Sequence, residues 1–297
     1  MSAIIYDLCP GCGSASIVKK LQANDFTVSM ESFEIWECND CTLRFTQSVP
    51  DAASIGGYYH SDAYVSHTNT NQGMVNKLYH FVRKRTLKKK QKQIQRFTQL
   101  HKGNLLDIGA GTGAFANYMQ QAGWQVTGLE PDAATRQRAT DLYGLQLQHA
   151  PALFNLRPES FDAITLWHVL EHVHELHAYI EQIKTLLTEK GKAFIAVPNY
   201  TSYDASAYKE FWAAYDVPRH LYHFSPAAMN QLLQLHGLKI ITSMPMWYDS
   251  FYVAMLSEKN KTSKNHFLKA FLVGLLSNFK TVFNTQRCSS LIYIIEK

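Results

Sequence analysis

The spacing of hydrophobic and polar positions changes near residue 103. From Met74 to about His101 the chain lacks proline and glycine, and its apolar residues keep helical spacing at both ends of the segment. Beyond it, short apolar runs alternate with segments of helical pattern. The runs predict strands at 104–108, 125–129, 145–148, 161–166, 192–197 and 239–242, and the segments between them predict helices at 114–122, 132–143, 176–187 and 225–236. Strands separated by helices indicate βαβ units, so we expect an α/β protein with a doubly wound, mostly parallel sheet and helices on both faces.

Three further segments depart from this alternation. Residues 1–50 hold short strand-like runs around four cysteines, and residues 51–73 are rich in Gly, Tyr, Ser, Asn and His, as is typical of a loop. Residues 265–283 carry an apolar stripe at positions 268, 272, 275, 276 and 279. We expect this stripe to pack on the main domain; a lid, a dimer face or an interfacial membrane helix are the alternatives. The predicted domains are 1–50, 51–102 and 103–297, the last with a helical insertion at about 258–284.

Charge is distributed unevenly over the 297 residues. The formal net charge is +5, but residues 63–106 carry ten basic and no acidic side chains, and residues 259–297 carry seven basic and one acidic. Any nucleic-acid or membrane-surface partner should therefore be sought at these two segments and not at the catalytic cleft, and a solvated helix face is the simpler explanation of the first. The start of the chain lacks a signal-peptide pattern and no apolar run is long enough to span a bilayer, so we expect a cytoplasmic protein.

A glycine-rich turn follows the first predicted strand of the sheet. Gly109, Gly111 and Gly113 stand at alternate positions before a predicted helix, whose first N–H groups are free to bind a ligand. Glu130 follows the next strand, where a carboxylate can accept hydrogen bonds from both hydroxyls of a ribose. Asp107 would disfavour a pyrophosphate beside it but suits a cationic ligand such as S-adenosylmethionine.

Together these segments resemble the class I S-adenosylmethionine-dependent methyltransferases over about residues 100–245. The matching segments are 105–113, 128–132, 160–164 and 167–173. The resemblance implies a Rossmann-like sheet whose last strand, here 289–295, runs antiparallel, and it implies S-adenosylmethionine as the cofactor. The predicted cofactor-binding residues are Asp107, Gly109, Ala110, Gly111, Gly113, Glu130, Pro131, Ala150, Pro151, Trp167 and His168. One position departs from the family pattern, because His149 stands where an acidic residue usually follows the third strand.

The string from His168 to His172 also fits His-x-x-Glu-His, an inverted zinc-protease signature. Two histidines four apart on a helix can bind one metal ion. This interpretation is set aside, because the string directly follows the fourth strand, where a loop rather than a long helix is expected.

Four cysteines form two Cys-x-x-Cys pairs, Cys9 with Cys12 and Cys38 with Cys41. This spacing lets four thiolates reach one tetrahedral zinc ion, and a site with four protein ligands is structural rather than catalytic. The combination resembles methyltransferases with an N-terminal zinc ribbon, among them sugar C-methyltransferases and ribosomal-RNA methyltransferases. The sugar enzymes carry a Glu-His pair before a Tyr-Phe-Ser stretch; here His220 matches, but Arg219 stands at the Glu position.

Histidine is the natural general base near neutral pH. The candidates near the carboxyl ends of the predicted strands are His220, His172 and His168, as base or acceptor ligand; surface histidines are the alternative. The predicted substrate-binding residues are Tyr215, Arg219, Tyr222, His223, Tyr59 and Tyr64. Residues 58–67 would form a lid hinged at Gly56 and Gly57, or else an ordinary linker.

The sequence therefore predicts a methyltransferase that uses S-adenosylmethionine, carries structural zinc and forms a possible homodimer. Its expected acceptor is a small molecule, either a sugar, a lipid-linked or a quinone-like compound, methylated on oxygen or carbon. One alternative is an RNA methyltransferase using the ribbon and the basic helix; against it, no Asn/Asp-Pro-Pro-Tyr string follows the fourth strand. The other is a non-enzymatic zinc-ribbon interaction module.

Overall fold

The computed structural model of the chain describes residues 3–59, 74–264 and 266–297. These form two compact units. The first unit comprises 1–65, 168–180 and 196–293, and the second comprises 66–167, 181–195 and 294–297. Each unit gathers segments that are distant in the sequence, whereas the predicted domains are continuous ranges. Those ranges stay a prediction.

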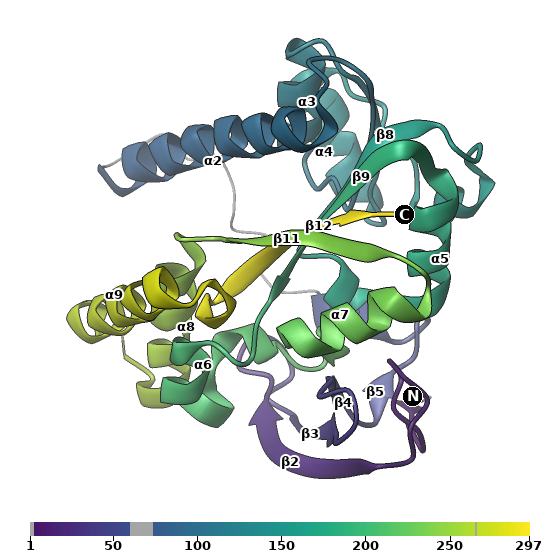
Figure 1. Cartoon of the computed structure of the whole chain (residues 1–297). Coiled ribbons are helices and arrows are strands. Elements are labelled where there is room, and N and C mark those ends of the chain that lie inside the picture. Colours follow the sequence, from purple (N-terminus) through teal and green to yellow (C-terminus); the bar gives the residue numbers. More distant parts are fainter. Residues whose placement is uncertain (1–2, 60–73, 265) are drawn as a thin grey trace. The chain divides into compact units, whose positions relative to one another are not determined.

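The second unit is built on parallel strands with the spacing that the apolar runs predicted. Its strands are β6 (Asn104–Ile108), β7 (Gln125–Leu129), β8 (Phe161–Trp167) and most of β9 (Leu187–Pro198), in the order β9-β8-β6-β7. Figure 1 labels β8 and β9 of this set. β6 pairs in parallel with both neighbours, with Asp107 opposite Gly128 on one side and Thr165 on the other. Leu105, Leu106 and Ile164 are fully buried, so the sheet interior is the core of this unit.

Helices of the second unit start and stop at the expected signals. They are α2 (Met74–Thr98), α3 (Ala114–Gln121) and α4 (Ala133–Tyr143), and the second part of α5 (Leu176–Leu186), from Glu181 on, also belongs to this unit and leads into β9. Asp132 caps α4, because its carboxylate accepts the Thr135 N–H at 2.9 Å, and Gly144 ends the helix in a left-handed conformation. A short 3₁₀ turn, η2 (Ala150–Asn155), follows α4.

The first unit contains an antiparallel ribbon. β2 (Ile17–Asn24), β3 (Ser32–Cys38), β4 (Arg44–Thr46) and β10 (Tyr222–His223) form a sheet in the order β10-β4-β3-β2, and β1 (Ala3–Ile4) pairs with β5 (Val49–Pro50). Figure 1 draws β2 to β5 in purple and violet. Tyr222 lies opposite Phe45 in the register of β10 and β4, so a segment late in the chain completes the N-terminal sheet.

The rest of the first unit is mostly helical. It holds β11 (Lys239–Pro245) beside the first part of β12 (Ser290–Glu296), together with α6 (Tyr203–Tyr208), α7 (Pro226–Leu235), α8 (Asp249–Thr262) and α9 (Phe267–Phe283). Its 3₁₀ turns are η1 (Ile55–Tyr59), η3 (Leu170–His172), η4 (Lys209–Phe211), η5 (Ala213–Tyr215) and η6 (Thr285–Arg287). Ser225 caps α7 by accepting the Ala228 N–H at 2.9 Å, as the Ser-Pro signal predicted.

Several sequence predictions need correction. The third predicted strand, 145–148, is only an isolated bridge between Leu129 and Gln148. The C-terminal helical segment begins at Asp249 rather than near 258, and it consists of two helices. The apolar stripe of α9 does not pack on the main domain; its large side chains are exposed. No described helix is long and apolar enough to cross a membrane.

Candidate functional site

The turn between β6 and α3 has a backbone that suits glycine. Gly109, Gly111 and Gly113 have φ values of 72°, 55° and 77°, in the left-handed region that glycine enters without strain. A Cβ on Gly113 would lie 2.7 Å from a Leu145 side-chain carbon, so packing requires glycine there. A Cβ on Gly111 would meet nothing within 4 Å. Gly111 therefore borders open space, in which a ligand could approach the backbone.

Two carboxylates lie at this turn. Asp107 is buried, and its Oδ1 accepts a hydrogen bond from the Thr165 hydroxyl at 2.7 Å. Burial raises the pKa of Asp107 to about 7, against the lowering effects of Thr165 and the Lys90 ammonium. Glu130 accepts the Gly111 N–H at 2.9 Å and the Asp132 N–H at 3.1 Å, one on each oxygen. Each Glu130 oxygen keeps a second lone pair with which to accept a ligand hydroxyl.

An aromatic pair and a cation lie in the same unit. The rings of Phe115 and Trp167 meet edge to face, with centroids 5.5 Å apart. The Lys90 Nζ of α2 lies 3.8 Å from the centroid of Trp167 and 5.6 Å from that of Phe115. Because the Lys90 charge also lowers the pKa of Asp107, this surface already attracts a cation. Lys90 therefore contacts this aromatic pair and lowers the pKa of Asp107, and is not simply a solvated side chain of α2.

The segment expected near the adenine is tied to the strand that carries Glu130. The Glu130 N–H donates to the Gln148 carbonyl at 2.9 Å, and the Gln148 N–H donates to Gly128 at 2.9 Å. Ala150 and Pro151 open η2 directly afterwards. The Pro131 carbonyl accepts a hydrogen bond from Arg136 at 2.7 Å.

Lys90, Thr165 and Phe115 are residues of this site that the sequence reasoning missed. A threonine inside an apolar strand was a usable signal for Thr165, because parallel register brings it opposite Asp107. Nothing in the sequence distinguishes Lys90 from the other basic residues of α2.

His168, which opens the next loop, is a cation held between two acids of the first unit. Its Nδ1 lies 3.3 Å from Glu171 Oε1, and its Nε2 lies 3.1 Å from Asp249 Oδ2. Burial alone would lower the pKa of His168, but these carboxylates raise it to about 10. Its φ of 60° is unusual for a residue with a side chain. At neutral pH His168 is therefore protonated.

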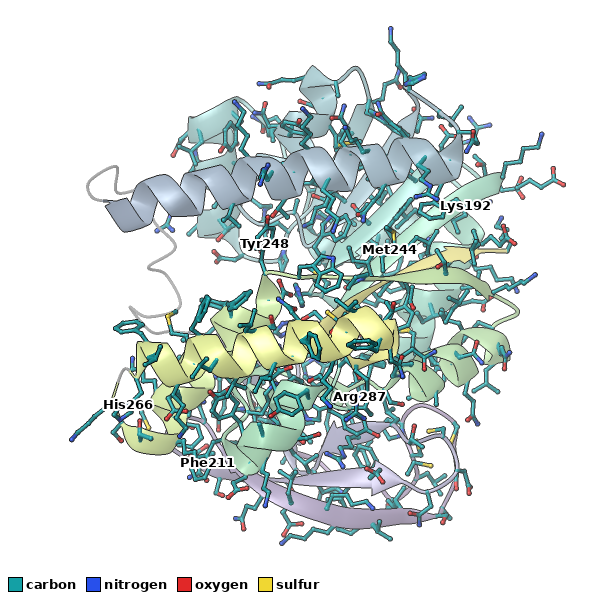
Figure 2. All side chains as sticks on the ribbon, turned by 60° about the vertical axis from the view of Figure 1, so that its left-hand side comes forward. Lys192, Phe211, Met244, Tyr248, His266 and Arg287 are labelled. Atoms are coloured by element: carbon teal, nitrogen blue, oxygen red, sulfur yellow. The ribbon has the colours of Figure 1, made fainter. Side chains whose placement is uncertain are left out.

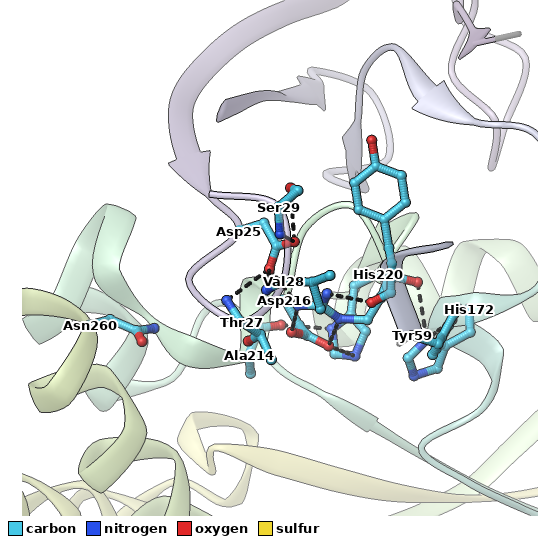
Figure 3. A network of polar contacts seen from close by, with 12 residues as sticks. Asp25, Thr27, Val28, Ser29, Tyr59, His172, Ala214, Asp216, His220 and Asn260 are labelled. Carbon is cyan, nitrogen blue, oxygen red and sulfur yellow. Dashed lines mark hydrogen bonds and ion pairs between the residues drawn. The ribbon is translucent and has the colours of Figure 1, made fainter. Parts of the chain in front are cut away.

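His172 and His220, by contrast, form an edge-to-face pair with ring centroids 4.5 Å apart. The His220 Nδ1 lies 2.8 Å from the Ala214 carbonyl, so Nδ1 carries a proton and donates it to that oxygen. The His172 Nδ1 lies 3.0 Å from both the Tyr59 hydroxyl and the Arg219 carbonyl (Figure 3). Burial, with the neighbouring His220, lowers the pKa of His172 to about 4, so this ring is neutral at neutral pH.

Glu171 lies next to these rings. It is fully buried, and its oxygens accept no hydrogen bond from the described residues, although His168 compensates its charge. One ligand atom from each of Glu171, His172 and His220 lies within 4.8 Å of the others. The string from His168 to His172 forms a loop with a short 3₁₀ turn, as expected, and not a long helix.

Four of the predicted substrate-binding residues are buried among protein partners in the first unit. The Tyr215 hydroxyl accepts from Arg44 at 2.8 Å, the Tyr222 hydroxyl donates to the His174 carbonyl at 3.2 Å, and His223 lies 3.2 Å from the Thr46 hydroxyl. Tyr59 contacts His172, whereas Tyr64 and most of the proposed lid lie outside the described residues. The substrate-binding role of these residues stays a prediction.

Arg219, the fourth of the buried set, is held in an ionic network. Its Nη2 lies 2.9 Å from Asp25 and 2.6 Å from Asp216, and its Nη1 donates to the Tyr58 carbonyl at 2.8 Å. Figure 3 shows Asp25 with the turn residues Thr27 to Ser29, whose backbone N–H groups donate to its carboxylate. Arg219 thus ties the N-terminal ribbon to the loop that carries His220.

The four N-terminal cysteines converge in the first unit. The sulfur atoms of Cys9 and Cys41 are 3.5 Å apart, those of Cys12 and Cys38 are 3.6 Å apart, and all four lie within 4.8 Å of one another. A Zn–S bond of about 2.3 Å places the sulfurs of a tetrahedral site about 3.8 Å apart. The Gly11 and Leu43 N–H groups donate to Cys9 and Cys41 at 3.4 and 3.5 Å, which favours thiolates there. The donor set therefore fits a tetrahedral zinc ion.

Comparison with known proteins identifies the region around the glycine turn. A family model described as a methyltransferase domain matches residues 79–243. A ubiquinone biosynthesis O-methyltransferase of Xanthomonas euvesicatoria is 28% identical over 51% of this chain and 69% of its own length. The enzyme of that name from Aeromonas salmonicida is 32% identical over 32% of this chain, but the match spans only 43% of its length. The curated relatives are thus matched over between 41% and 69% of their own length.

Among solved structures, a putative sarcosine dimethylglycine methyltransferase from Galdieria sulphuraria is similar in fold. Its TM-score is 0.50 at 13% identity, and the match covers 71% of this chain and 84% of that one. This likeness confirms the predicted fold class.

Proposed function

The chain belongs to the methyltransferase-domain family, since the family model covers more than half of it, and we propose that it transfers a methyl group from S-adenosylmethionine to the oxygen or carbon of a small-molecule acceptor. The observation that carries this proposal is the turn at Gly111. It combines open space above a glycine with two carboxylates, Asp107 and Glu130.

The residues at the turn fit the expected cofactor. Glu130 would accept hydrogen bonds from the ribose hydroxyls on its remaining lone pairs. Asp107, with Lys90 already nearby, would hold the positive charge of the methionine end, and the face of Trp167 favours a cation. When bound, the cofactor supplies an electrophilic methyl group on a sulfonium. The protein's part is then to bind and orient it and to remove a proton from the acceptor.

His172 and His220 are the proposed general bases. The pKa of His172 is lowered to about 4, so that ring is neutral at neutral pH, and the His220 Nδ1 lies 2.8 Å from the Ala214 carbonyl, which directs its Nε2 away from that contact. His168 is a poor base, since it already carries a proton; we assign it an electrostatic role beside Glu171 and Asp249. A hydroxyl acceptor gains from such a base, because its oxygen becomes a better nucleophile on losing a proton.

The acceptor class to test first is a hydroxylated aromatic ring with an apolar tail. This choice is supported by the names of the relatives, which are ubiquinone biosynthesis O-methyltransferases. A deoxysugar nucleotide is the second class, favoured by the zinc-ribbon resemblance but weakened by Arg219 at the Glu position.

The test has two parts. First, S-adenosylmethionine at about 100 times its dissociation constant should add about 2.7 kcal/mol of stability, seen as a rise in Tm, and Asp107→Ala should abolish that rise. Asp141→Ala, an exposed aspartate of the same unit, is the matched control. Second, mass spectrometry should detect a gain of one methyl group in a polyprenylated catechol, and His220→Asn should reduce that product. The absence of both cofactor binding and product in the wild-type protein would contradict the proposal.

We further propose that Cys9, Cys12, Cys38 and Cys41 hold a structural zinc ion. With four protein ligands the ion would have no open position, so it would stabilise the ribbon and not take part in methyl transfer. Metal analysis should give about one zinc per chain, and Cys38→Ser should lose it. Protein that is folded and metal-free without any chelator would contradict this assignment.

A further inference from the structure

Helix α9 is oriented with its large apolar side chains in solvent. Nine of them are between 45% and 75% exposed: Phe267, Leu268, Phe271, Leu272, Leu275, Leu276, Phe279, Val282 and Phe283. Their spacing places them on one face of the helix. Figure 2 shows this helix in pale yellow, running between the labelled His266 and Arg287. Single exposed apolar residues are ordinary, but a continuous stripe along a whole helix marks an interaction surface.

The buried face of α9 explains why its large apolar side chains are directed to solvent. Its buried residues are small: Ala270, Gly274, Ser277 and Thr281. A Cβ on Gly274 would lie 2.7 Å from a ring carbon of Phe251 and 3.1 Å from its Cα, so α8 and α9 pack too closely for a larger residue. The Ser277 hydroxyl donates to buried Asp204 at 2.8 Å, which fixes the rotation of the helix about its axis.

These contacts also exclude a simple inversion of α9. Turning the apolar stripe inward would bring bulky side chains to the close contact at Gly274 and would leave Asp204 without the Ser277 hydroxyl. The exposed stripe is therefore a fixed feature of the first unit, and the packing of α9 within that unit leaves its apolar surface uncovered.

The charged residues around the stripe indicate what kind of partner binds it. Residues 259–287 contain six basic side chains and no acidic one. All six are exposed: Lys259, Lys261, Lys264, Lys269, Lys280 and Arg287. One of them, Lys269, pairs at 2.9 Å with the buried Glu258, which directly precedes this segment. A second copy of the chain would bring like charges together across a twofold axis, whereas an anionic lipid surface would attract them.

We propose that α9 binds the surface of an anionic membrane, with its apolar face inserted at the headgroup boundary and its lysines on the lipid phosphates. The helix lies in the interface and does not span the bilayer, in keeping with its length and its small buried face. This surface is independent of the methyl-transfer proposal, because it involves none of the residues assigned to cofactor, acceptor or zinc.

The test is sedimentation of the full chain with vesicles. One set is phosphatidylcholine alone, and the other is phosphatidylcholine mixed with phosphatidylglycerol. We expect most of the protein to sediment with the anionic vesicles at low salt and little with the neutral ones. Replacing Leu272, Leu276 and Phe279 together by Gln should lower the partition coefficient at least tenfold, by an order-of-magnitude estimate from the lost apolar area. Replacing Lys261, Lys264 and Lys280 by Gln should weaken binding at low salt only.

The matched control replaces three equally exposed apolar residues elsewhere, Met30, Leu142 and Leu235, by Gln. This control should sediment like the wild type, and all variants should keep the wild-type circular dichroism spectrum and Tm. A wild-type protein that binds neither vesicle set, or an α9 variant that binds as well as the wild type, would overturn the proposal. So would light scattering that shows a wild-type dimer dissociated by the α9 substitutions, since a second copy would then cover the stripe.

Discussion

Replacing Asp107 by Asn should stabilise the protein in the absence of cofactor, and more so as the pH rises. Asp107 is buried at the end of β6, and burial raises the pKa of its carboxyl to about 7. The folded chain therefore disfavours the ionised form. An amide at the same position carries no charge, and its oxygen can still accept the Thr165 hydroxyl that Asp107 accepts now.

The magnitude follows from the two pKa values. Between the ordinary value of 3.8 and about 7, the penalty for ionising the folded protein reaches about 4 kcal/mol, as an upper bound. The sign is fixed by linkage: stability is fully present below the ordinary pKa and is lost as the pH rises to about 7. At pH 5 roughly 1.5 kcal/mol is already lost, so the advantage of the Asn variant over wild type should grow by about 2 to 3 kcal/mol between pH 5 and pH 8.

Urea unfolding without cofactor, followed by tryptophan fluorescence at several pH values, measures this difference. Asp141→Asn, an exposed aspartate of the same unit, should run parallel to wild type. Calorimetry on the same proteins should show that Asp107→Asn binds S-adenosylmethionine more weakly. The buried carboxylate destabilises the cofactor-free protein but attracts the cationic cofactor, and the amide does neither. If wild type and Asp107→Asn keep a constant difference from pH 5 to pH 8, the reasoning about this carboxyl is wrong.

Three other outcomes are expected. Glu130→Gln should weaken S-adenosylmethionine binding by roughly tenfold or more in calorimetry, because one ribose acceptor becomes a donor; unchanged affinity would remove Glu130 from the site. Arg219→Met should destabilise the first unit by about 3 to 5 kcal/mol in urea unfolding, since it leaves the buried carboxylate of Asp25 without its cation, whereas the exposed Arg138→Met should not. A strong chelator should lower the Tm of the wild type and leave the cofactor affinity of the remaining folded protein unchanged; a chelator-resistant Tm would argue against structural zinc.

Much of the second unit could be predicted from local pattern. The strand 104–108 and the strand 125–129 have the predicted bounds, and α4 begins at its Asp132 cap. These elements are specified by neighbours in the sequence: buried apolar runs, glycines that end strands, and side chains that cap helices. The strand predicted at 145–148 is wrong because a local pattern does not record pairing. A short apolar run becomes a strand only where a neighbouring strand pairs with it, and here a single bridge forms.

The histidine cluster depended on tertiary contacts that no local pattern records. His168, His172 and His220 all looked equivalent as candidate bases. The structure separates them by their partners: Asp249 lies 81 residues from His168 in the chain and keeps it charged, while the carbonyls of Ala214 and Arg219 fix the other two rings. Arg219 itself looked like a substrate ligand, yet its partner Asp25 comes from the N-terminal ribbon, 194 residues away.

The apolar stripe of α9 shows that a hydrophobic pattern predicts an amphipathic helix but not which of its faces is buried. Amphipathicity predicts that a helix has two faces, and the usual assumption assigns the apolar face to the core. In α9 the orientation of the helix is set by the opposite face, where Gly274 packs closely against Phe251 and the Ser277 hydroxyl donates to Asp204. Close packing of small residues and one buried carboxylate thus outweigh the burial of nine large apolar side chains within the chain. The nine side chains therefore stay available to an apolar environment outside this packing, and the six basic residues around them favour an anionic lipid surface as that environment.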